Sequence, residues 1–486
     1  MASGKRITRR QVLRIAGVAG GTAALAACGA TPTPQVVEKV VTQIVAGTPQ
    51  VVKETMVVKE TQIVKETVVV QQTVLATAPA AAGPVTISLL MVDWNEDCRK
   101  LYDEEILPKF QEQNPGWTVA ADYTSWGDLD VKVMTAFAGG LQPDCFQADN
   151  VEFGPKYNQK GIIAELNPLI DSSPDIRPKM DDFYPKALFE GATIGGKVVA
   201  LPYVLDNRAL YYRKDFLREA GLPDSPPENW EQFRDAAIKQ TKRSDDTFER
   251  AGWHADLGQF CFQNYVPLLW ENGGELLDDA HQRCVFNSDA GVEALSLWVR
   301  LIREDRVGPT EDMPAVGDMT PYVAGTLAMV FSGYGELLNA QKYAPQIWDS
   351  IGITVLGEKQ KGSLWYANTF FLSKGKRLNE AWKLLSYLVL DDDNFRKYHE
   401  ATGGLPPRKS IASSAKHITP LHMILINDVM AAPGSHTTPA EPFNAEVLER
   451  VTEACQNAVY GKATPKEALD KAAQEGDQII ARYRGA

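Results

Sequence analysis

Residues 85–92 read Val-Thr-Ile-Ser-Leu-Leu-Met-Val, an apolar run that lies between Gly83-Pro84 and Asp93. Such a run, with turn residues on both sides, predicts a buried first strand. The pattern changes after it: residues 97–113 carry apolar side chains at near-helical spacing, which predicts a helix. Further along we expect a strand at 117–123, a helix at 129–138 and a short strand at 143–148. Alternating strands and helices are typical of a parallel α/β sheet.

The segment from about residue 85 to the C-terminus is too long for one hydrophobic core. About 400 residues of ordinary globular composition predict two lobes, with a cleft between them. The chain is acidic, with a formal net charge of −12, and has no basic run beyond its first residues. This charge distribution argues against a nucleic-acid partner.

The N-terminus has the features of an export signal, which we assign to residues 1–27. Residues 8–14 read Thr-Arg-Arg-Gln-Val-Leu-Arg, and the pair Arg9-Arg10 resembles the twin-arginine signal for export of folded proteins. The apolar run that follows, 15–27, is shorter than the roughly 20 residues of a membrane-spanning helix. We therefore expect a cleaved signal peptide, not a transmembrane anchor.

This signal ends in Leu25-Ala26-Ala27-Cys28-Gly29, which looks like a bacterial lipobox. The resemblance implies that Cys28 is lipidated and that the chain is held at the outer face of the cytoplasmic membrane. The alternative is an ordinary cleavage site with an incidental cysteine.

Residues 28–84 predict a tether. A six-residue repeat begins at Val51-Val52-Lys53-Glu54-Thr55-Met56, and a period of six builds no single helical face. The segment has no aromatic residues and cannot bury enough surface to order itself, so we expect coil. A transient helix or strand is the alternative, because Val and Ile favour extended backbone.

The mature cysteines form an odd set without a C-x-x-C pair: Cys98, Cys145, Cys261, Cys284 and Cys455. A zinc or redox site is therefore not expected, and we predict no metal and no cofactor. We expect mostly buried free thiols, with Cys261–Cys284 the pair for any bridge.

Several motifs recur in order along the globular part. They are G-G-L-Q-P-D-C-F at 139–146, G-I-I-A-E-L-N-P-L-I at 161–170, G-K-V-V-A-L-P-Y at 196–203, L-Y-Y-R-K-D-F-L-R-E-A-G-L-P at 210–223, P-E-N-W-E-Q-F at 227–233, N-G-G-E-L-L at 272–277, A-G-T-L-A-M-V-F-S-G at 324–333 and L-N-E-A-W-K-L-L-S-Y-L at 378–388. With this order and spacing the chain resembles the family 1 extracellular solute-binding proteins, which include the maltose- and oligosaccharide-binding proteins of ABC importers.

The resemblance implies a two-lobed periplasmic-binding-protein-like α/β fold, each lobe a mostly parallel sheet flanked by helices. Lobe 1 would hold residues 85–204 and 366–404, and lobe 2 residues 205–365 and 405–486. The chain would cross between lobes near 203–208, 365–368 and 403–406, which permits hinge closure. The implied function is capture of a sugar or oligosaccharide by a monomer that delivers it to a membrane permease.

A sugar site needs an aromatic ring to stack against and amide or carboxylate groups to bond the hydroxyls. In open α/β sheets such groups gather just beyond the carboxyl ends of strands. Aromatic residues next to Asp, Asn or Glu therefore mark the candidates, with Trp94 and Trp365 the foremost. The predicted ligand-binding residues are Trp94, Glu96, Trp126, Asp149, Asn150, Asp206, Asn207, Trp270, Asn272, Tyr334, Trp365, Tyr366, Asn368 and Phe443.

Core packing is the competing interpretation for each of these tryptophans, because Trp is usually largely buried. We assign Trp230, Trp298, Trp348 and Trp382 to the core. Tyr334 stands in Gly333-Tyr334-Gly335, where many family members have Gly-x-Trp, and this departure puts the stacking geometry of that lobe in doubt.

Other functions remain open. The same fold could bind a polyol, a glycerol phosphodiester, a peptide or a ferric ion, the last suggested by Tyr211-Tyr212, although adjacent strand residues point to opposite faces. A secreted glycan-degrading enzyme needs two facing carboxylates. No nucleophile elbow, HExxH or phosphate-binding glycine loop is present, so we predict a binding protein and no enzyme.

Overall fold

The computed structural model describes residues 36–45, 48–57, 84–149, 152–185, 188–245, 247–254 and 256–485. The chain divides into two units, Met1–Ala80 and Ala81–Ala486. In the first unit, β1 (Val36–Val45) pairs antiparallel with β2 (Thr48–Val57). This hairpin differs from the expected coil, because the β-branched residues of both strands favour extended backbone. The expected signal peptide, Cys28 and the repeats after residue 57 lie outside the described residues.

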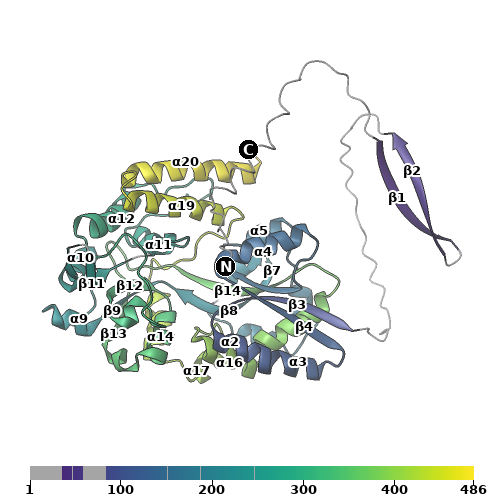
Figure 1. Ribbon diagram of the computed structural model, residues 1–486, viewed down its shortest axis with the longest axis horizontal. Helices are drawn as coiled ribbons and strands as arrows, with labels where there is room; N and C mark the ends of the chain where they lie inside the picture. The colour runs from purple at the N-terminus through teal and green to yellow at the C-terminus, as the bar shows by residue number, and fades with distance from the viewer. Residues whose placement is uncertain are drawn as a thin grey trace, which may run out of the picture. The chain divides into compact units, whose positions relative to one another are not determined.

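The second unit is built on two five-stranded sheets (Figure 1). We call the part around the first sheet lobe 1 and the part around the second sheet lobe 2. The first sheet has the order β4 (Trp117–Thr124), β3 (Val85–Val92), β5 (Cys145–Asp149), β14 (Trp365–Leu372), β8 (Ala200–Asn207). The second has the order β10 (Lys242–Ser244), β11 (Thr247–Trp253), β12 (Leu327–Ser332), β9 (Ala209–Arg213), β13 (Ile351–Thr354).

The two-lobed fold is as expected, but the prediction of mostly parallel sheets is wrong, since both sheets are mixed. In the first sheet β3 pairs parallel with β4 and β5, whereas β14 pairs antiparallel with β5 and β8. In the second sheet only β11 and β12 are parallel. The reason is the connection between lobes. β8 carries the chain toward lobe 2 and β14 brings it back, so these two neighbours run in opposite directions.

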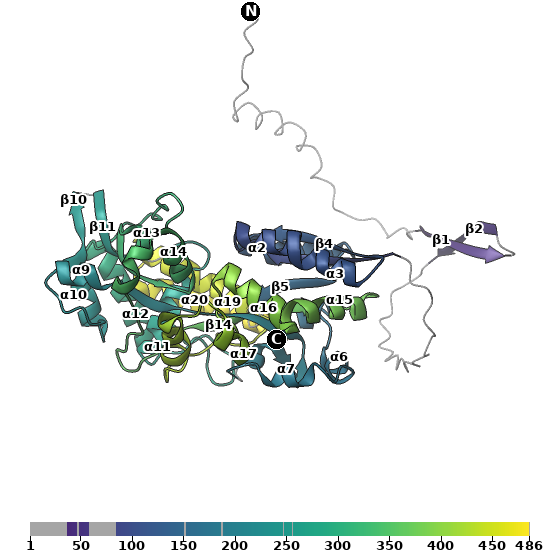
Figure 2. The same ribbon diagram turned by 90° about the horizontal axis from the view of Figure 1, so that it is seen from below.

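The first segment that crosses between the lobes is shorter than the expected segment 203–208. β8 stays in the first sheet to Asn207 and β9 of the second sheet begins at Ala209, which leaves Arg208 as the connection. Figure 1 shows β8 and β14 between the two sheets, and Figure 2 shows β14 from below. Pro202 lies within β8, an edge strand, next to an irregularity in its pairing with β14. An edge position tolerates proline because its missing N–H removes no internal ladder bond.

The segment after residue 404 was expected in lobe 2, but its first part lies against lobe 1. The backbone N–H of Leu205 donates to the carbonyl of Leu405 at 2.9 Å, and Tyr184 N–H donates to Pro407 O at 2.8 Å. Gly403 ends the preceding helix with a left-handed backbone (φ 66°). A side chain there would contact Leu338 of lobe 2, so glycine allows the close approach.

Helices cover both sheets. Those of lobe 1 are α2 (Glu96–Lys100), η1 (Leu101–Ile106), α3 (Leu107–Gln113), α4 (Trp126–Ala138), α5 (Gly154–Gln159), α6 (Asn167–Asp171), α7 (Arg177–Asp181), α8 (Leu188–Ala192), α15 (Leu378–Leu385), η4 (Ser386–Leu390), α16 (Asp392–Thr402) and α17 (Lys409–Ser414), with the small hairpin β6 (Thr193–Ile194) and β7 (Lys197–Val198). The remaining helices are α9 (Lys214–Glu219), α10 (Trp230–Gln240), α11 (Phe262–Glu271), α12 (Asp289–Val299), η2 (Arg300–Glu304), α13 (Pro321–Ala324), α14 (Gly335–Tyr343), η3 (Pro345–Ser350), α18 (Pro420–Ile424), η5 (Leu425–Val429), α19 (Asn444–Val459) and α20 (Pro465–Arg484). Within the described part of the chain, no helix is long and apolar enough to cross a membrane.

Alternation along β3 explains how the first sheet is buried on both faces. Ile87, Leu89 and Met91 belong to one hydrophobic cluster, while Leu90 and Val92 belong to a second. Successive strand residues point to opposite faces, so a strand buried on both sides reads as a continuous apolar run. A third cluster fills lobe 2.

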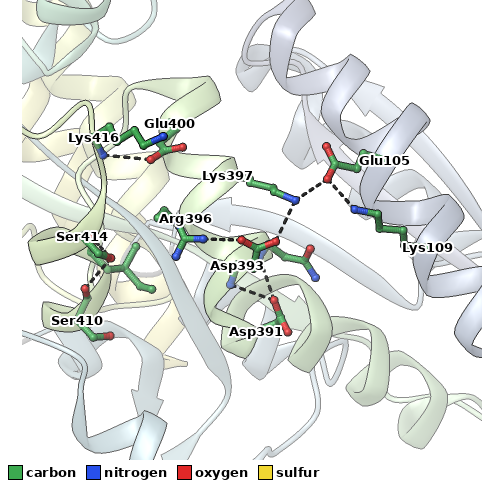
Figure 3. A network of polar contacts seen from close by, with 12 residues as sticks. Glu105, Lys109, Asp391, Asp393, Arg396, Lys397, Glu400, Ser410, Ser414 and Lys416 are labelled. Atoms are coloured by element: carbon green, nitrogen blue, oxygen red, sulfur yellow. Dashed lines mark hydrogen bonds and ion pairs between the residues drawn. The ribbon is translucent and has the colours of Figure 1, made fainter.

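A surface network joins the segments of lobe 1 that are distant in sequence (Figure 3). Lys397 of α16 forms ion pairs with Glu105 of η1 and with Asp393 one turn earlier on its own helix. Lys109 of α3 also contacts Glu105, at 2.8 Å. A single exposed ion pair contributes little to the free energy of unfolding. The role of this network is therefore to hold α16 against η1.

Candidate ligand-binding cleft

The carboxyl ends of β3, β5 and β8 and the start of β14 meet at one edge of the first sheet. Asn368 of β14 pairs with Asp149 at the end of β5, and Tyr366 pairs with Asp206 near the end of β8. Trp94 follows β3 by two residues. The strand order therefore brings together polar and aromatic side chains from four separate parts of the sequence.

These side chains line a cavity of about 250 Å³, here called the inner compartment. Its described lining comprises Trp94, Trp126, Asp149, Glu152, Phe153, Asp206, Arg208, Phe260, Phe262, Gln263, Leu364, Tyr366, Asn368, Thr438 and Leu448. The wall from lobe 2 comes from α11, α19 and the loops before them. The site thus lies between the lobes, where closure changes both walls at once.

A second cavity of about 470 Å³, the outer compartment, adjoins the first. The two share Trp94, Asp206, Arg208, Phe260 and Gln263. The outer compartment adds Asn95, Asp256, Asn264, Val330, Phe331, Ser332, Gly333, Tyr334, Gly335, Leu338 and Thr402. The five shared residues form a wall that both compartments have in common.

Aromatic rings form one wall of this cleft. The rings of Trp94 and Trp126 meet edge to face with centroids 5.6 Å apart, and Trp94 lies 6.5 Å from Tyr334. Trp94 and Trp126 are each half-buried, whereas Tyr334 is 4 % exposed. Partly exposed indole rings beside a cavity offer faces on which an apolar patch of a ligand can lie.

Arg208 is the polar centre at the hinge. Its Nη1 donates to Asp206 Oδ2 at 2.9 Å, and its Nε donates to Gln263 Oε1 of α11 at 2.9 Å. The guanidinium also lies over the ring of Tyr366, 5.2 Å from its centroid. Tyr366 in turn donates its hydroxyl to Asp206 Oδ2 at 3.0 Å. Arg208 therefore joins both hinge strands to a helix of lobe 2.

Glu152 supplies a second carboxylate to the inner compartment. Its backbone N–H donates to Asp149 Oδ1 at 2.7 Å. Burial, followed by the nearby carboxylates of Asp149 and Asp130, raises the pKa of Glu152 to about 8. The nearest cation, Lys156, lowers this pKa only partly, because its ammonium group pairs with Asp130 at 2.7 Å. The surroundings of Glu152 therefore favour the neutral form of its carboxyl group.

The structure brings half of the predicted site residues to the cleft. Those on its walls are Trp94, Trp126, Asp149, Asp206, Tyr334, Tyr366 and Asn368. Asn150 lies outside the described residues. Five of them lie within two residues of the carboxyl end of a strand, whereas Tyr366 and Asn368 lie in the first half of β14.

The predictions for Trp365 and Asn207 are corrected by the direction of their side chains. Trp365 is 6 % exposed and belongs to the core cluster of the hinge, since neighbours along β14 point to opposite faces and Tyr366 takes the cleft side. Asn207 is fully buried, and its side-chain amide donates to Leu425 O at 2.8 Å. Both residues support the hinge and do not line the cleft.

Four further candidates lie away from the cleft. Trp270 and Phe443 are each 1 % exposed in the core of lobe 2. Asn272 is 1 % exposed and donates to Ala290 O at 3.0 Å. Glu96 is exposed and pairs with Lys100 one turn later on α2. The prediction that these four residues contact the ligand is therefore wrong, since none of them lines either compartment.

Several lining residues were not predicted. Arg208 follows Asp206-Asn207 directly and could have been found from the expected hinge crossing. Phe260 and Gln263 lie in and just after a loop that has no strand-end or sugar-site signature in the sequence. Only the approach of lobe 2 toward the first sheet places them in the site.

The positions of Tyr211 and Tyr212 do not support a ferric-ion site. Tyr211 and Tyr212 are both buried, and they belong to different hydrophobic clusters because they point to opposite faces of β9. They therefore do not form a pair for ferric iron. Among the described residues no group of three or more His, Cys, Asp or Glu side chains could hold a metal ion.

The five cysteines in the described part of the chain are buried and free, in line with the expected buried thiols, and Cys261 and Cys284 form no bridge. Cys261 contacts helix α19, where its thiol donates to Thr452 O at 3.4 Å, whereas Cys284 N–H donates to Asp477 of α20 at 2.7 Å. The two thiols face different helices.

A family model described as "Bacterial extracellular solute-binding protein" matches residues 105–422. Among curated relatives, a putative binding protein of Brucella abortus (strain 2308) is 23 % identical over 387 residues, covering 78 % of this chain and 90 % of its own. The sn-glycerol-3-phosphate-binding periplasmic protein UgpB of Escherichia coli K12 is 22 % identical over 413 residues, covering 78 % and 89 %.

Solved structures share the fold over nearly their whole length. An ABC transporter solute-binding protein of Thermotoga lettingae, bound with α-D-tagatose, is 22 % identical with a TM-score of 0.71 and covers 82 % of this chain and 100 % of its own. Maltose-bound MalE3 of T. maritima is 20 % identical with a TM-score of 0.70, covering 81 % and 100 %. These similarities establish the two-lobed architecture in which the cleft lies.

Proposed function

Because this chain belongs to the bacterial extracellular solute-binding proteins, we propose that it is the substrate-binding subunit of an ABC importer and that its ligand is a sugar or oligosaccharide. The observation that carries the proposal is the pairing of indole rings with hydroxyl-binding groups in one cavity. Trp94 and Trp126 offer ring faces, while Asn368 and Asp206 offer amide and carboxylate groups. Sugars present C–H patches flanked by hydroxyls, which is the complement of this wall.

Both lobes contribute residues to the walls of the cleft, and this arrangement supports capture of the ligand by hinge closure. The inner compartment takes Trp94 and Asn368 from lobe 1 and Phe262 and Gln263 from lobe 2. A ligand that contacts both walls binds the closed arrangement more tightly than the open one and shifts the population toward it. The closed form would then be the one that a permease recognises.

Delivery requires the chain to stay near the membrane. We propose that the twin-arginine signal at 1–27 is removed, that Cys28 carries lipid, and that residues 29–84 tether a monomeric binding unit at the outer face of the cytoplasmic membrane. The partners would be the transmembrane subunits of the importer. No catalytic step is part of this proposal.

Glycerol 3-phosphate is the second candidate ligand, favoured by the name of the UgpB relatives. A phosphate is normally held by free Arg or Lys groups. Arg208 is the cation on the described walls of both compartments, and Asp206, Gln263 and Tyr366 already surround it. The sugar proposal therefore fits the cleft better.

The test is isothermal calorimetry with residues 81–486, which form a compact unit by themselves. The panel holds mono- and disaccharides, polyols, glycerol 3-phosphate, peptides and ferric citrate. We expect saturable binding of one sugar class and none of the others. Binding of glycerol 3-phosphate, a peptide or iron without any sugar would overturn the carbohydrate proposal and leave the binding-protein fold intact.

A further inference from the structure

The two lobes contribute different chemistry to the described walls of the inner compartment. The lobe 1 wall carries two indole rings, a phenyl ring and five polar side chains, which are Asp149, Glu152, Asp206, Tyr366 and Asn368. The lobe 2 wall carries four apolar side chains, Phe260, Phe262, Leu364 and Leu448, beside Gln263 and Thr438. Groups that can bind hydroxyls are thus concentrated on one side of this cavity.

Three of the apolar residues on the lobe 2 wall are fixed in the core of that lobe. Phe262 is 5 % exposed, and Leu364 and Leu448 are each 2 % exposed. All three belong to the hydrophobic cluster that fills lobe 2. Protein interiors are packed as densely as organic crystals, so such side chains have little room to move aside. The wall that they form is therefore a lasting apolar surface.

The two polar side chains of the lobe 2 wall already have partners within the protein. Gln263 Oε1 accepts from Arg208 Nε at 2.9 Å and from Arg208 Nη2 at 2.5 Å. Thr438 Oγ1 accepts from Asn444 Nδ2 at 2.9 Å. The backbone carbonyl of Leu364 accepts from Arg208 N–H at 2.8 Å. A ligand hydroxyl that faces lobe 2 therefore meets few groups with which it can form a hydrogen bond.

An ordinary hexose does not match this wall. Its hydroxyls are distributed around the whole pyranose ring, so the edge turned toward lobe 2 brings a hydroxyl against apolar side chains. That hydroxyl loses its hydrogen bonds to water without replacement, which disfavours binding. A bridging water gives no remedy, because a buried water needs roughly two to four polar partners. A methyl group in the same place avoids this loss and gains apolar contact.

Resting on the proposed function, we infer that the sugar in this cleft carries a methyl group on the edge that faces Phe262, Leu364 and Leu448, as a 6-deoxyhexose does. Its hydroxyls lie toward lobe 1, where Asn368 and Asp206 are, and its ring lies against the indole wall. The apolar wall of lobe 2 then selects the methyl-bearing sugar over the hexose that has a hydroxymethyl group instead.

The experiment measures dissociation constants of residues 81–486 for matched sugar pairs by isothermal calorimetry. The pairs are D-fucose with D-galactose, L-fucose with L-galactose, L-rhamnose with L-mannose, 6-deoxy-D-glucose with D-glucose, and rutinose with the disaccharide that has L-mannose in place of its L-rhamnose. Methyl α-D-glucoside with D-glucose tests a methyl group on the glycosidic oxygen. We expect one methyl-bearing sugar to bind at least about tenfold more tightly than its partner, which is typical for a methyl-sized difference in an apolar pocket.

Substitutions on the lobe 2 wall test where the methyl group lies. Leu448→Gln brings an amide to this wall, so the hydroxylated partner gains a hydrogen bond and the preference should fall at least about threefold. Leu222→Gln is the matched control, because Leu222 is half-buried against the same hydrophobic cluster and lines neither compartment. This control should keep the preference. If Leu448→Gln does not fold, Phe262→Tyr adds a hydroxyl to the same wall with little change in shape and carries the same expectation.

The outcomes separate this inference from the proposed function. Equal or tighter binding of the hydroxylated sugar in every pair overturns the inference but supports sugar binding. A methyl preference that stays unchanged in both wall variants also overturns it, since another part of the cleft would then hold the methyl group. A preference in the glucoside pair alone supports the inference and places the methyl group on the glycosidic oxygen. No binding of any sugar counts against both proposals.

Discussion

Tyr366 of β14 lies opposite Asp206 of β8, and its hydroxyl donates to the Asp206 carboxylate at 3.0 Å. The two strands carry the chain across the hinge in opposite directions, so this bond ties the outgoing and returning segments together. Arg208 contacts both partners and reaches Gln263 of lobe 2. Asp206, Arg208 and Tyr366, which lie where the chain crosses between the lobes, thus also line the cleft.

The aromatic wall predicts a large effect of a single substitution. We expect Trp94→Ala to weaken ligand binding at least about tenfold, because the indole ring contacts both compartments and its loss removes the stacking surface. Trp117→Ala is the matched control, a half-buried tryptophan on β4 that lines neither compartment. Calorimetry with the ligand found in the screen measures both. Equal losses in the two variants would show a general effect on folding instead of a binding contact.

The hinge network predicts a stability effect. Arg208→Met removes donors from Asp206 and Gln263 and leaves their oxygens poorly satisfied, which costs roughly 1–3 kcal/mol of unfolding free energy. Asp206→Asn should cost less, and the double variant should cost less than the sum, because the two residues interact directly. Urea denaturation of residues 81–486 gives the four values of this cycle. Strict additivity would contradict the network.

Two buried histidines, His399 and His422, and the half-buried His417 predict loss of stability in acid. Burial lowers the pKa of His399, His417 and His422, the last to about 3. The unfolded chain therefore binds more protons below the ordinary histidine pKa of about 6.5, and the free energy of unfolding falls as pH drops from 6.5 toward 3. Arg408 near His399 opposes protonation further, whereas Glu400 near His417 favours it.

Thermal melts between pH 7 and pH 4 check this prediction. His422→Gln keeps a side-chain acceptor near Thr419 but cannot be protonated, so the fall in melting temperature should become shallower. His281→Gln, at an exposed ring, should follow the unmodified protein. A melting temperature independent of pH over this range would be inconsistent with neutral buried rings.

The buried cysteine thiols should react slowly with thiol reagents. Burial raises the pKa of Cys98 and Cys284 to about 12, so neither forms an appreciable thiolate at pH 8. We expect Ellman's reagent to label the native unit only as fast as it unfolds, and all five thiols to react in denaturant. A mass lower by two hydrogens, or rapid labelling of the native state, would contradict free buried cysteines.

The N-terminal signal predicts where the chain is found. In a bacterial host that acylates lipoproteins, the unmodified chain should sediment with membranes and incorporate labelled palmitate. Cys28→Ser should abolish the label and release the protein, because the lipid chains are the anchor. Membrane association that persists in Cys28→Ser would point to another anchor.

The sequence alone determined the first strands of lobe 1 and the region of the site. Residues 85–92, 117–123 and 143–148 carry their strand pattern locally, and parallel strands place Trp94 and Asp149 at one edge without further information. The N-cap of α10 is likewise local, because Asn229 directly precedes the helix and its side chain accepts from Gln232 N–H at 2.9 Å.

The tertiary structure decided which side chains face the cleft. Trp365 and Tyr366 are neighbours of similar size, and only the packing of β14 between β5 and β8 shows that Tyr366 lines the cavity while Trp365 is buried. Phe260 and Gln263 reach the site from lobe 2, and Gln263 is 55 residues away in sequence from its partner Arg208. Local periodicity fixes where a strand ends, but contacts between lobes depend on pairings that span hundreds of residues, and no local pattern records them.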